Sequence, residues 1–319
     1  MHFTSLPEAY APFGAALRYS LTNPSGSNLQ IAVRRDDGTL LGTKQFLAAT
    51  SCDIDIAPML RHTLEMTPLA FDSGFYSGAR RCLTVEVEAS NDEETILSER
   101  RTFTATTEPI QRPSLLTTLP TKRLITPDGY DELTFVAEEP LEAIVTSSAG
   151  YHTAIESFAS STGGMQLFCL HASDFPRAER IVVEVGSIAT IEYTVVPAIE
   201  GMQHVAWCSS AGSIEHYTFP TTERVNLETT KRYHRSPTAR HAHCTSIEER
   251  MQLCSNYETP AMMRALGEVL TSEQVWLLRG EEYEAVDVVT LAAELHRHGT
   301  LRRLSIEIRS TRNNGTLWN

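Results

Sequence analysis

The sequence has no long apolar run and no recognisable targeting segment. No apolar stretch approaches the roughly 20 residues that a membrane-spanning helix needs, so we expect no transmembrane segment. The first residues, Met1 to Glu8, lack a basic segment followed by an apolar one, and we therefore expect no secretory signal peptide.

Short motifs that carry a catalytic mechanism are also missing. The chain contains no Gly-x-Ser-x-Gly, no His-Glu-x-x-His, no P-loop and no Gly-x-Gly-x-x-Gly after a strand. We therefore expect a protein that is not an enzyme, with no catalytic residue and no cofactor. Two other functions, given below, are favoured over a glycosidase, which stays a third alternative. A glycosidase needs only two carboxylates about 5–10 Å apart across a cleft, and Asp and Glu are abundant.

None of the six cysteines belongs to a Cys-x-x-Cys pair. Disulfide-dense scaffolds are much shorter than this chain, so the even number of cysteines says little about cross-links. Cys52, Cys82, Cys169 and Cys208 lie inside apolar, strand-like runs. We interpret these residues as buried free thiols.

Acidic residues outnumber basic ones, and the excess lies in the first two thirds of the chain. The net charge is -13, of which residues 1–200 carry -12, with 26 Asp and Glu against 14 Lys and Arg. Such a surface repels phosphate backbones and anionic membranes, so neither nucleic acid nor membrane is an expected partner. A local basic run at Lys231, Arg232, Arg235 and Arg240 is interpreted as a solvated strand edge or loop.

Short segments of alternating hydrophobicity are abundant, and they predict a mainly β protein. We expect two antiparallel β-sandwich units followed by a C-terminal α+β unit. The predicted division is a sandwich at residues 1–106, a Pro- and Thr-rich linker at 107–120, a smaller sandwich at 121–197 and the α+β domain at 198–319. A chain of 319 residues fits two or three domains.

Turn signals separate the predicted strands of the two sandwiches. The strands are expected at residues 29–33, 40–46, 52–56, 83–88 and 96–103, and then at 133–136, 141–146, 152–158, 165–170, 180–185 and 190–196. Residues 72–74 and 77–78 are expected in loops. Asp53 and Asp55 share one strand face, as paired catalytic carboxylates can, but an ordinary amphipathic strand with Ile54 on its other face explains them.

The α+β unit begins with a predicted hairpin at residues 205–220. Trp207, Tyr217 and Phe219 alternate with other residues on either side of a turn that contains Gly212. These three rings could form a sugar-binding platform, and a carbohydrate-binding or adhesin-like surface protein is therefore the alternative function. Aromatic rings on a hairpin are more often core residues, because burying each ring is favourable by a few kcal/mol.

A metal site is weakly indicated by His241, His243 and Cys244, with Cys254 ten residues further on. Imidazole and thiolate groups are proper zinc ligands, but this spacing matches no known finger or knuckle pattern. We therefore favour a polar surface loop at these residues and expect no bound metal.

A short helix is predicted after the hairpin, with Thr259 as its N-cap and Pro260 at its first position. Apolar residues recur along one face of this helix, and three further strands follow it near residues 274–278, 284–289 and 301–309. The residues that carry the pattern of the whole unit are Val205, Trp207, Gly212, Ile214, Tyr217, Phe219 and Pro220 in the hairpin, and Leu266, Leu270, Ser272, Val275, Trp276 and Leu277 in the helix and the next strand.

This pattern, over roughly residues 200–310, resembles the C-terminal part of structural proteins from phages and prophages of Bacteroidetes. The resemblance implies a non-enzymatic component of a phage-tail-like particle, which acts through protein–protein contacts. The implied partners are other structural proteins of the particle and further copies of the same chain, in a homo-oligomer. The implied location is the cytoplasm during assembly and then the virion or tail-like particle.

Overall fold

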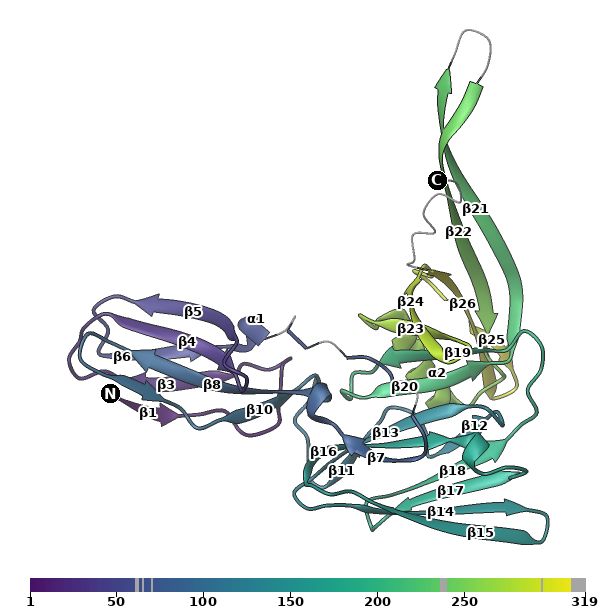
Figure 1. The fold of residues 1–319 in the computed structure, drawn as a ribbon, viewed down its shortest axis with the longest axis horizontal. Coiled ribbons are helices and arrows are strands. Elements are labelled where there is room, and N and C mark those ends of the chain that lie inside the picture. Colours follow the sequence, from purple (N-terminus) through teal and green to yellow (C-terminus); the bar gives the residue numbers. More distant parts are fainter. Residues whose placement is uncertain (61–62, 65, 70, 236–239, 294, 311–319) are drawn as a thin grey trace.

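The structure is a computed structural model of the chain, and it describes residues 1–60, 63–64, 66–69, 71–235, 240–293 and 295–310. For residues 232, 234–235 and 240–247 only the backbone is described. The predicted fold class is confirmed, because two β-sandwiches precede a larger sheet that carries a helix (Figure 1). In the part of the chain that is described, no helix is both long enough and apolar enough to cross a membrane.

The first sandwich consists of a sheet in the order β1-β3-β6 and a sheet in the order β2-β10-β8-β4-β5, with β9 beside β8. Its strands are β1 (His2–Ser5), β2 (Ala11–Pro12), β3 (Arg18–Thr22), β4 (Leu29–Arg35), β5 (Leu40–Phe46), β6 (Ser51–Asp55), β8 (Cys82–Ser90), β9 (Thr95–Leu97) and β10 (Arg101–Thr104). The helices α1 (Ala57–Leu60) and η1 (Ala79–Arg81, a 3₁₀ helix) lie between them. On β6 the side chains of Asp53 and Asp55 are exposed while Ile54 is buried, as an amphipathic strand requires.

The second sandwich has one sheet in the order β11-β13-β16-β7 and another in the order β12-β18-β17-β14-β15. Its elements are β7 (Gly74–Ser77), β11 (Ser114–Leu116), β12 (Lys122–Ile125), β13 (Tyr130–Ala137), β14 (Glu142–Ala149), β15 (His152–Ala159), β16 (Gly164–His171), the 3₁₀ helix η2 (Ala172–Asp174), β17 (Arg180–Val185) and β18 (Ala189–Val195). Apart from β7 and β9, the two sandwiches share one strand order, in which β2 pairs in parallel with β10 and β12 pairs in parallel with β18. The sequence shows no repeat that would have revealed this.

Two short segments of the second sandwich correct the sequence prediction. Strand β7 was expected in loops within the first unit, yet it pairs with β16 from Gly74 opposite Cys169 to Ser77 opposite Gln166. Strand β11 was expected in the linker and pairs with β13. Strands of three and four residues are too short to show an alternating pattern. Strand β7 lies among the strands of the first sandwich in the sequence but belongs to a sheet of the second, and we call it the lent strand. The centroid of its Phe75 ring lies 5.1 Å from that of the Phe168 ring.

The third unit is an eight-stranded sheet in the order β20-β19-β23-β24-β26-β22-β21, in which β25 also pairs with β26. Its elements are β19 (Gln203–Cys208), β20 (Ile214–Phe219), β21 (Thr221–Arg235), β22 (Arg240–Cys254), α2 (Pro260–Gly267), the 3₁₀ helix η3 (Glu268–Leu270), β23 (Val275–Arg279), β24 (Glu282–Val288), β25 (Leu295–His298) and β26 (Leu301–Ser310). The predicted cap of α2 is confirmed, because Thr259 Oγ1 accepts a hydrogen bond from the Met262 N–H. Leu266 on the same face is fully buried.

Strands β21 and β22 form a hairpin that extends far beyond the rest of the third unit (Figure 1). Each strand has 15 residues, but β22 pairs with β26 only from Arg250 to Cys254. We define the arm as residues 229–247, in which the described backbone pairs with no strand outside the hairpin. From Thr229 to Arg235 the strand rises by roughly 20 Å. The basic run predicted as a strand edge or loop lies on these two strands.

Candidate functional site

Buried charged side chains join the second sandwich to the third unit. Arg123 on β12 donates a hydrogen bond of 2.7 Å to Asp131 on β13, and the Tyr193 hydroxyl donates one of 2.7 Å to the same carboxylate oxygen. Arg123 also lies 3.9 Å from Glu215 on β20, whose other oxygen accepts the Thr118 N–H at 2.9 Å. All four side chains are at most 5% exposed. Moving the two units apart would leave buried charges without their partners, which is unfavourable. These contacts therefore hold the two units in one relative position.

A second buried ion pair anchors the lent strand. Arg81, at the end of η1, donates to both carboxylate oxygens of Glu132 on β13 at 2.8 Å. The Leu69 N–H donates to the same carboxylate at 3.3 Å. Both charged side chains are 1% exposed. Contacts to one glutamate therefore fix the chain on either side of β7.

Two imidazoles lie beside this junction, that of His216 buried and that of His204 partly buried. His204 Nε2 on β19 is 3.1 Å from His216 Nδ1 on β20, and His204 Nδ1 is 3.0 Å from Thr218 Oγ1. Burial lowers the pKa of His204 to about 4, and it lowers the pKa of His216 well below its usual value. Both rings are therefore neutral at pH 7. The adjoining cavity has a volume of about 20 Å³, which is room for one water molecule and not for a substrate.

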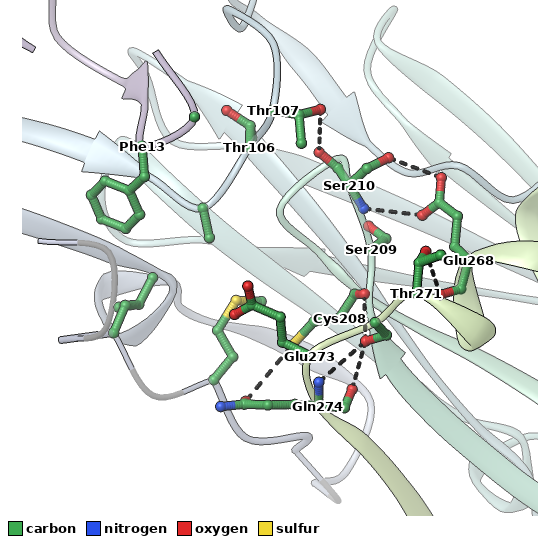
Figure 2. A pocket seen from close by; sticks show the side chains of 15 residues that line it. Phe13, Thr106, Thr107, Cys208, Ser209, Ser210, Glu268, Thr271, Glu273 and Gln274 are labelled. Carbon is green, nitrogen blue, oxygen red and sulfur yellow. Dashed lines mark hydrogen bonds between the residues drawn. The ribbon is translucent and has the colours of Figure 1, made fainter. Parts of the chain in front are cut away.

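A larger cavity, of about 410 Å³, lies between the first sandwich and the third unit (Figure 2). Its polar walls are bonded to one another, because the Ser210 N–H and hydroxyl donate to Glu268 at 3.0 and 2.8 Å and Ser210 O accepts from Thr107. Burial raises the pKa of the Cys208 thiol to about 12, so this sulfur is not a thiolate nucleophile at neutral pH. No histidine lines the described cavity, and a nucleophile with an adjacent imidazole base is not formed.

The three aromatic residues predicted as a possible glycan platform belong to the core of the third unit. Trp207 and Phe219 are 0% exposed and Tyr217 is 7% exposed. The Tyr217 hydroxyl donates to Glu258 at 2.9 Å, and its ring packs edge-to-face on Phe219. A sugar needs an exposed ring face, so this platform is not formed and the prediction is corrected. The rings are buried because α2 and the neighbouring strands cover the hairpin face that carries them.

The residues of the weak metal candidate, His241, His243 and Cys244, lie in strand β22, whereas a surface loop was predicted there. The backbone of His241 pairs with that of His234, Cys244 pairs with Arg232, and His243 falls at a shift of register. The side chains of His241, His243 and Cys244 lie outside the described part of the structure. This metal site stays an untested prediction.

The predicted buried thiols agree with the structure in two cases and in part in two others. Cys52 and Cys169 are buried, whereas Cys82 and Cys208 are partly buried. Burial raises the pKa of each of these four thiols. Each is a free cysteine, and none has the lowered pKa of a reactive thiol.

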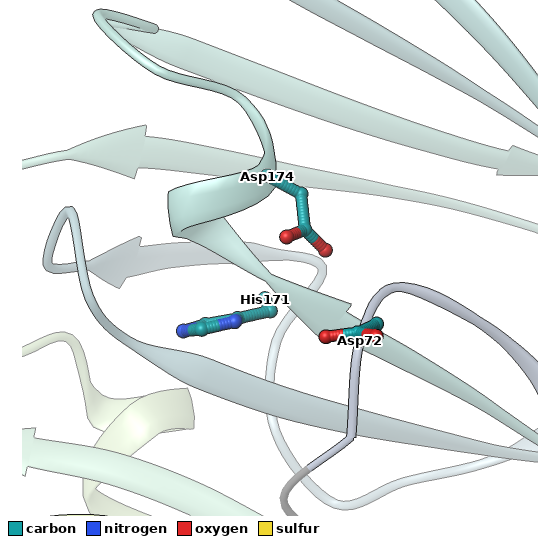
Figure 3. A group of neighbouring side chains, drawn as sticks. All are labelled: Asp72, His171 and Asp174. Carbon is teal, nitrogen blue, oxygen red and sulfur yellow. The ribbon is translucent and has the colours of Figure 1, made fainter.

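A group of side chains that sequence analysis did not single out meets beside β7. One potential ligand atom from each of Asp72, His171 and Asp174 lies within 4.8 Å of the others (Figure 3). Asp72 was expected in a loop, and it precedes the other two residues by about a hundred positions. No local spacing could have indicated their proximity, because only the pairing of β7 with β16 brings them together.

Comparisons with known proteins give little further information. No protein-family model matches the chain, and no curated protein matches it. Among solved structures, the chain is similar to a crystal structure of Dpr2 Ig1-Ig2 in complex with DIP-Theta Ig1-Ig3, at 8% sequence identity. The alignment covers 97% of this chain and 88% of that chain, with a TM-score of 0.22. At such a low score the likeness supports no statement about function.

Proposed function

We propose that this protein is a non-enzymatic structural component of a phage-tail-like particle, and that it assembles through protein–protein contacts of the β21–β22 hairpin. The observation that carries this proposal is the arm, whose described backbone pairs with no other strand of the chain. An isolated two-stranded hairpin is at best marginally stable in water. A partner that packs on the hairpin would supply burial that the described residues of this chain do not.

The hairpin carries a row of exposed apolar side chains. Val225, Leu227 and Tyr233 on β21 are 53%, 69% and 44% exposed. Val225 and Leu227 are two residues apart and share one face of the strand, and Tyr233 follows a register shift further along it. Strand β21 is also the edge of the eight-stranded sheet. An exposed apolar row on an edge strand is a surface suited to a protein partner.

The charge of the arm complements the rest of the chain. Residues 229–247 contain four Lys and Arg and no Asp or Glu, so they carry +4. Subtracting this charge from the chain's -13 leaves -17 for the remaining residues. A basic arm on an acidic body suits contact between copies, with the arm of one copy on the acidic surface of the next. Complementary charge of this kind speeds association and fixes orientation.

The three units of the chain are joined to one another, which suits a structural component. The buried ion pair Arg81–Glu132 and the lent strand β7 tie the second sandwich to the first, and the buried pair Arg123–Glu215 ties it to the third unit. A partner that docks on the arm would therefore act on a connected framework.

The test compares two substitutions of equal exposure and equal charge. Leu227→Asp and Ile155→Asp each replace a side chain that is 69% exposed, the first on the hairpin and the second on the edge strand β15. Sedimentation velocity should show an oligomer for the unmodified chain and for Ile155→Asp, and a shift toward monomer for Leu227→Asp. Equal sedimentation of both variants would refute the role of the hairpin.

The particle itself is tested by electron microscopy of the purified chain with the products of neighbouring genes. We expect rings or tubes of regular diameter, and fewer of them at about 0.5 M than at about 0.05 M salt, because salt screens the charge of the arm. A chain that stays monomeric and ignores these products would refute the particle assignment.

A further inference from the structure

Three side chains with metal-binding atoms meet where β7 enters the second sandwich (Figure 3). Asp72 precedes β7, His171 ends β16, and Asp174 closes the 3₁₀ helix η2. Their ligand atoms lie within 4.8 Å of one another, with Asp72 and Asp174 exposed and His171 half-buried. The group therefore joins a segment of the first sandwich to two elements of the second, and it is open to solvent.

Hydrogen bonds and a ring contact hold two of these residues, His171 and Asp174, in place. The Ser73 N–H donates to Asp174 Oδ2 at 2.8 Å, and the His171 N–H donates to Ser73 Oγ at 2.9 Å. The Tyr130 ring stacks on the His171 ring with a centroid distance of 3.9 Å and an angle of 9°. Ser173 Oγ lies 3.0 Å from His171 Nδ1, close enough to orient the imidazole. Supporting contacts of this kind are what fix the ligands of a metal site.

Two of the three side chains carry negative charge. Asp72 and Asp174 each offer a carboxylate oxygen, and these two atoms lie within 4.8 Å of each other. Among the ion pairs of the described residues, none involves Asp72 or Asp174. A cation would therefore relieve repulsion that the neighbouring side chains leave uncompensated.

We propose that Asp72, His171 and Asp174 bind a divalent first-row transition metal ion of the Zn²⁺ or Mn²⁺ type. Two carboxylates and an imidazole suit these ions, whereas Ca²⁺ and Mg²⁺ prefer oxygen ligands throughout. Bonds of about 2.0–2.2 Å place ligand atoms roughly 3–3.5 Å apart, so the carboxylates must close by about 1 Å. Exposed aspartates can do so, and water completes the coordination. The bound ion ties the lent strand to the sandwich that receives it.

The first experiment measures metal binding by the full chain after chelator treatment. Isothermal titration with ZnCl₂ and with MnCl₂ should reveal a site that Asp174→Asn and His171→Gln weaken by about tenfold or more. Asp53→Asn, which changes an exposed aspartate on β6, should bind as the unmodified chain does. Absence of binding of both metals, or unchanged affinity in Asp174→Asn and His171→Gln, would overturn the proposal.

A second measurement separates a lost ligand from a damaged fold and from the other histidines. Asn keeps an oxygen that can accept the Ser73 N–H, so Asp174→Asn should unfold at the same temperature as the unmodified chain in EDTA. Zn²⁺ should raise that temperature only in the unmodified chain. The double variant His241→Gln/His243→Gln should retain the site, and loss of all binding in this variant would assign the metal to β22 and refute the proposal. Both measurements use the isolated chain, so their outcome is independent of particle assembly.

Discussion

Acidification should weaken the junction of the second sandwich and the third unit through His204. Burial lowers the pKa of this imidazole from 6.5 to about 4, whereas in the unfolded chain it titrates near its ordinary value. Between these two pH values the unfolded state binds more protons than the folded state. The free energy of unfolding therefore falls as the pH falls from about 6.5 to about 4, and the contribution is fully present above that range.

The magnitude follows from the difference between the two pKa values. A shift from 6.5 to about 4 corresponds to about 3 kcal/mol of unfolding free energy, lost once the pH is below about 4. His216 acts in the same direction, because burial and then the charges of His204, Arg81 and Arg123 lower its pKa. Asp131 and Asp128 oppose the effect at His204, but burial outweighs them.

The assay is urea unfolding followed by tryptophan fluorescence from about pH 7.5 to about pH 4, for the unmodified chain and for His204→Gln. Gln keeps a group that can bond to Thr218 and His216 but does not titrate. Carboxylates titrate in both proteins, so the difference between the two pH profiles isolates the imidazole. The unmodified chain should lose about 3 kcal/mol more than the variant across this range. Parallel profiles would show that His204 is not held neutral by burial.

Three further substitutions test the packing. Glu132→Ala should lower the free energy of unfolding by about 3–5 kcal/mol, because Arg81 stays buried without its partner. Replacing both residues by apolar ones should lower it far less. Urea unfolding and hydrogen exchange at β7 measure both effects. Thr259→Ala should cost about 1 kcal/mol of unfolding free energy by removing the cap of α2, and an unchanged urea midpoint would contradict that role. Gly212→Ala should cost about 1–3 kcal/mol and lower the melting temperature, because Gly212 has a φ of 77° and a Cβ there would lie 2.7 Å from Thr106 Cγ2.

Most strands could be predicted from the sequence because alternation is a local signal. The segments expected at 40–46 and 180–185 match β5 and β17 in both bounds, and the Thr259 cap with Pro260 located α2. Each of these elements buries one face, so its pattern survives in the sequence without knowledge of its neighbours.

Elements that depend on distant partners could not be predicted. Strand β7 is a strand only because β16 offers it an edge, and its four residues show no periodicity. The arm was predicted only in part. Its basic run was interpreted as a strand edge or loop and residues 241–244 as a loop, because the described backbone of the arm pairs only within the hairpin and its sequence is polar. Buried charges such as Glu215 and Arg123 also look like surface residues until the units that enclose them are assembled.

The site residues show the same limit. Trp207 and Phe219 could be recognised as hairpin residues, but their burial depends on α2 and the sheet. Asp72 and His171 are brought together because β7 pairs with β16 of the second sandwich. No spacing in the sequence indicates this contact.

Assembly through the arm is tested most directly by sedimentation velocity of a chain without it. Glu228 lies directly opposite Glu248, so residues 229–247 can be replaced by an Asn-Gly turn that closes the shortened hairpin. The full chain should sediment as an oligomer, alone or with its neighbouring gene products, and the shortened chain as a folded monomer. Oligomers of the same size from both chains, or a full chain that is monomeric under every condition, would contradict the proposed function.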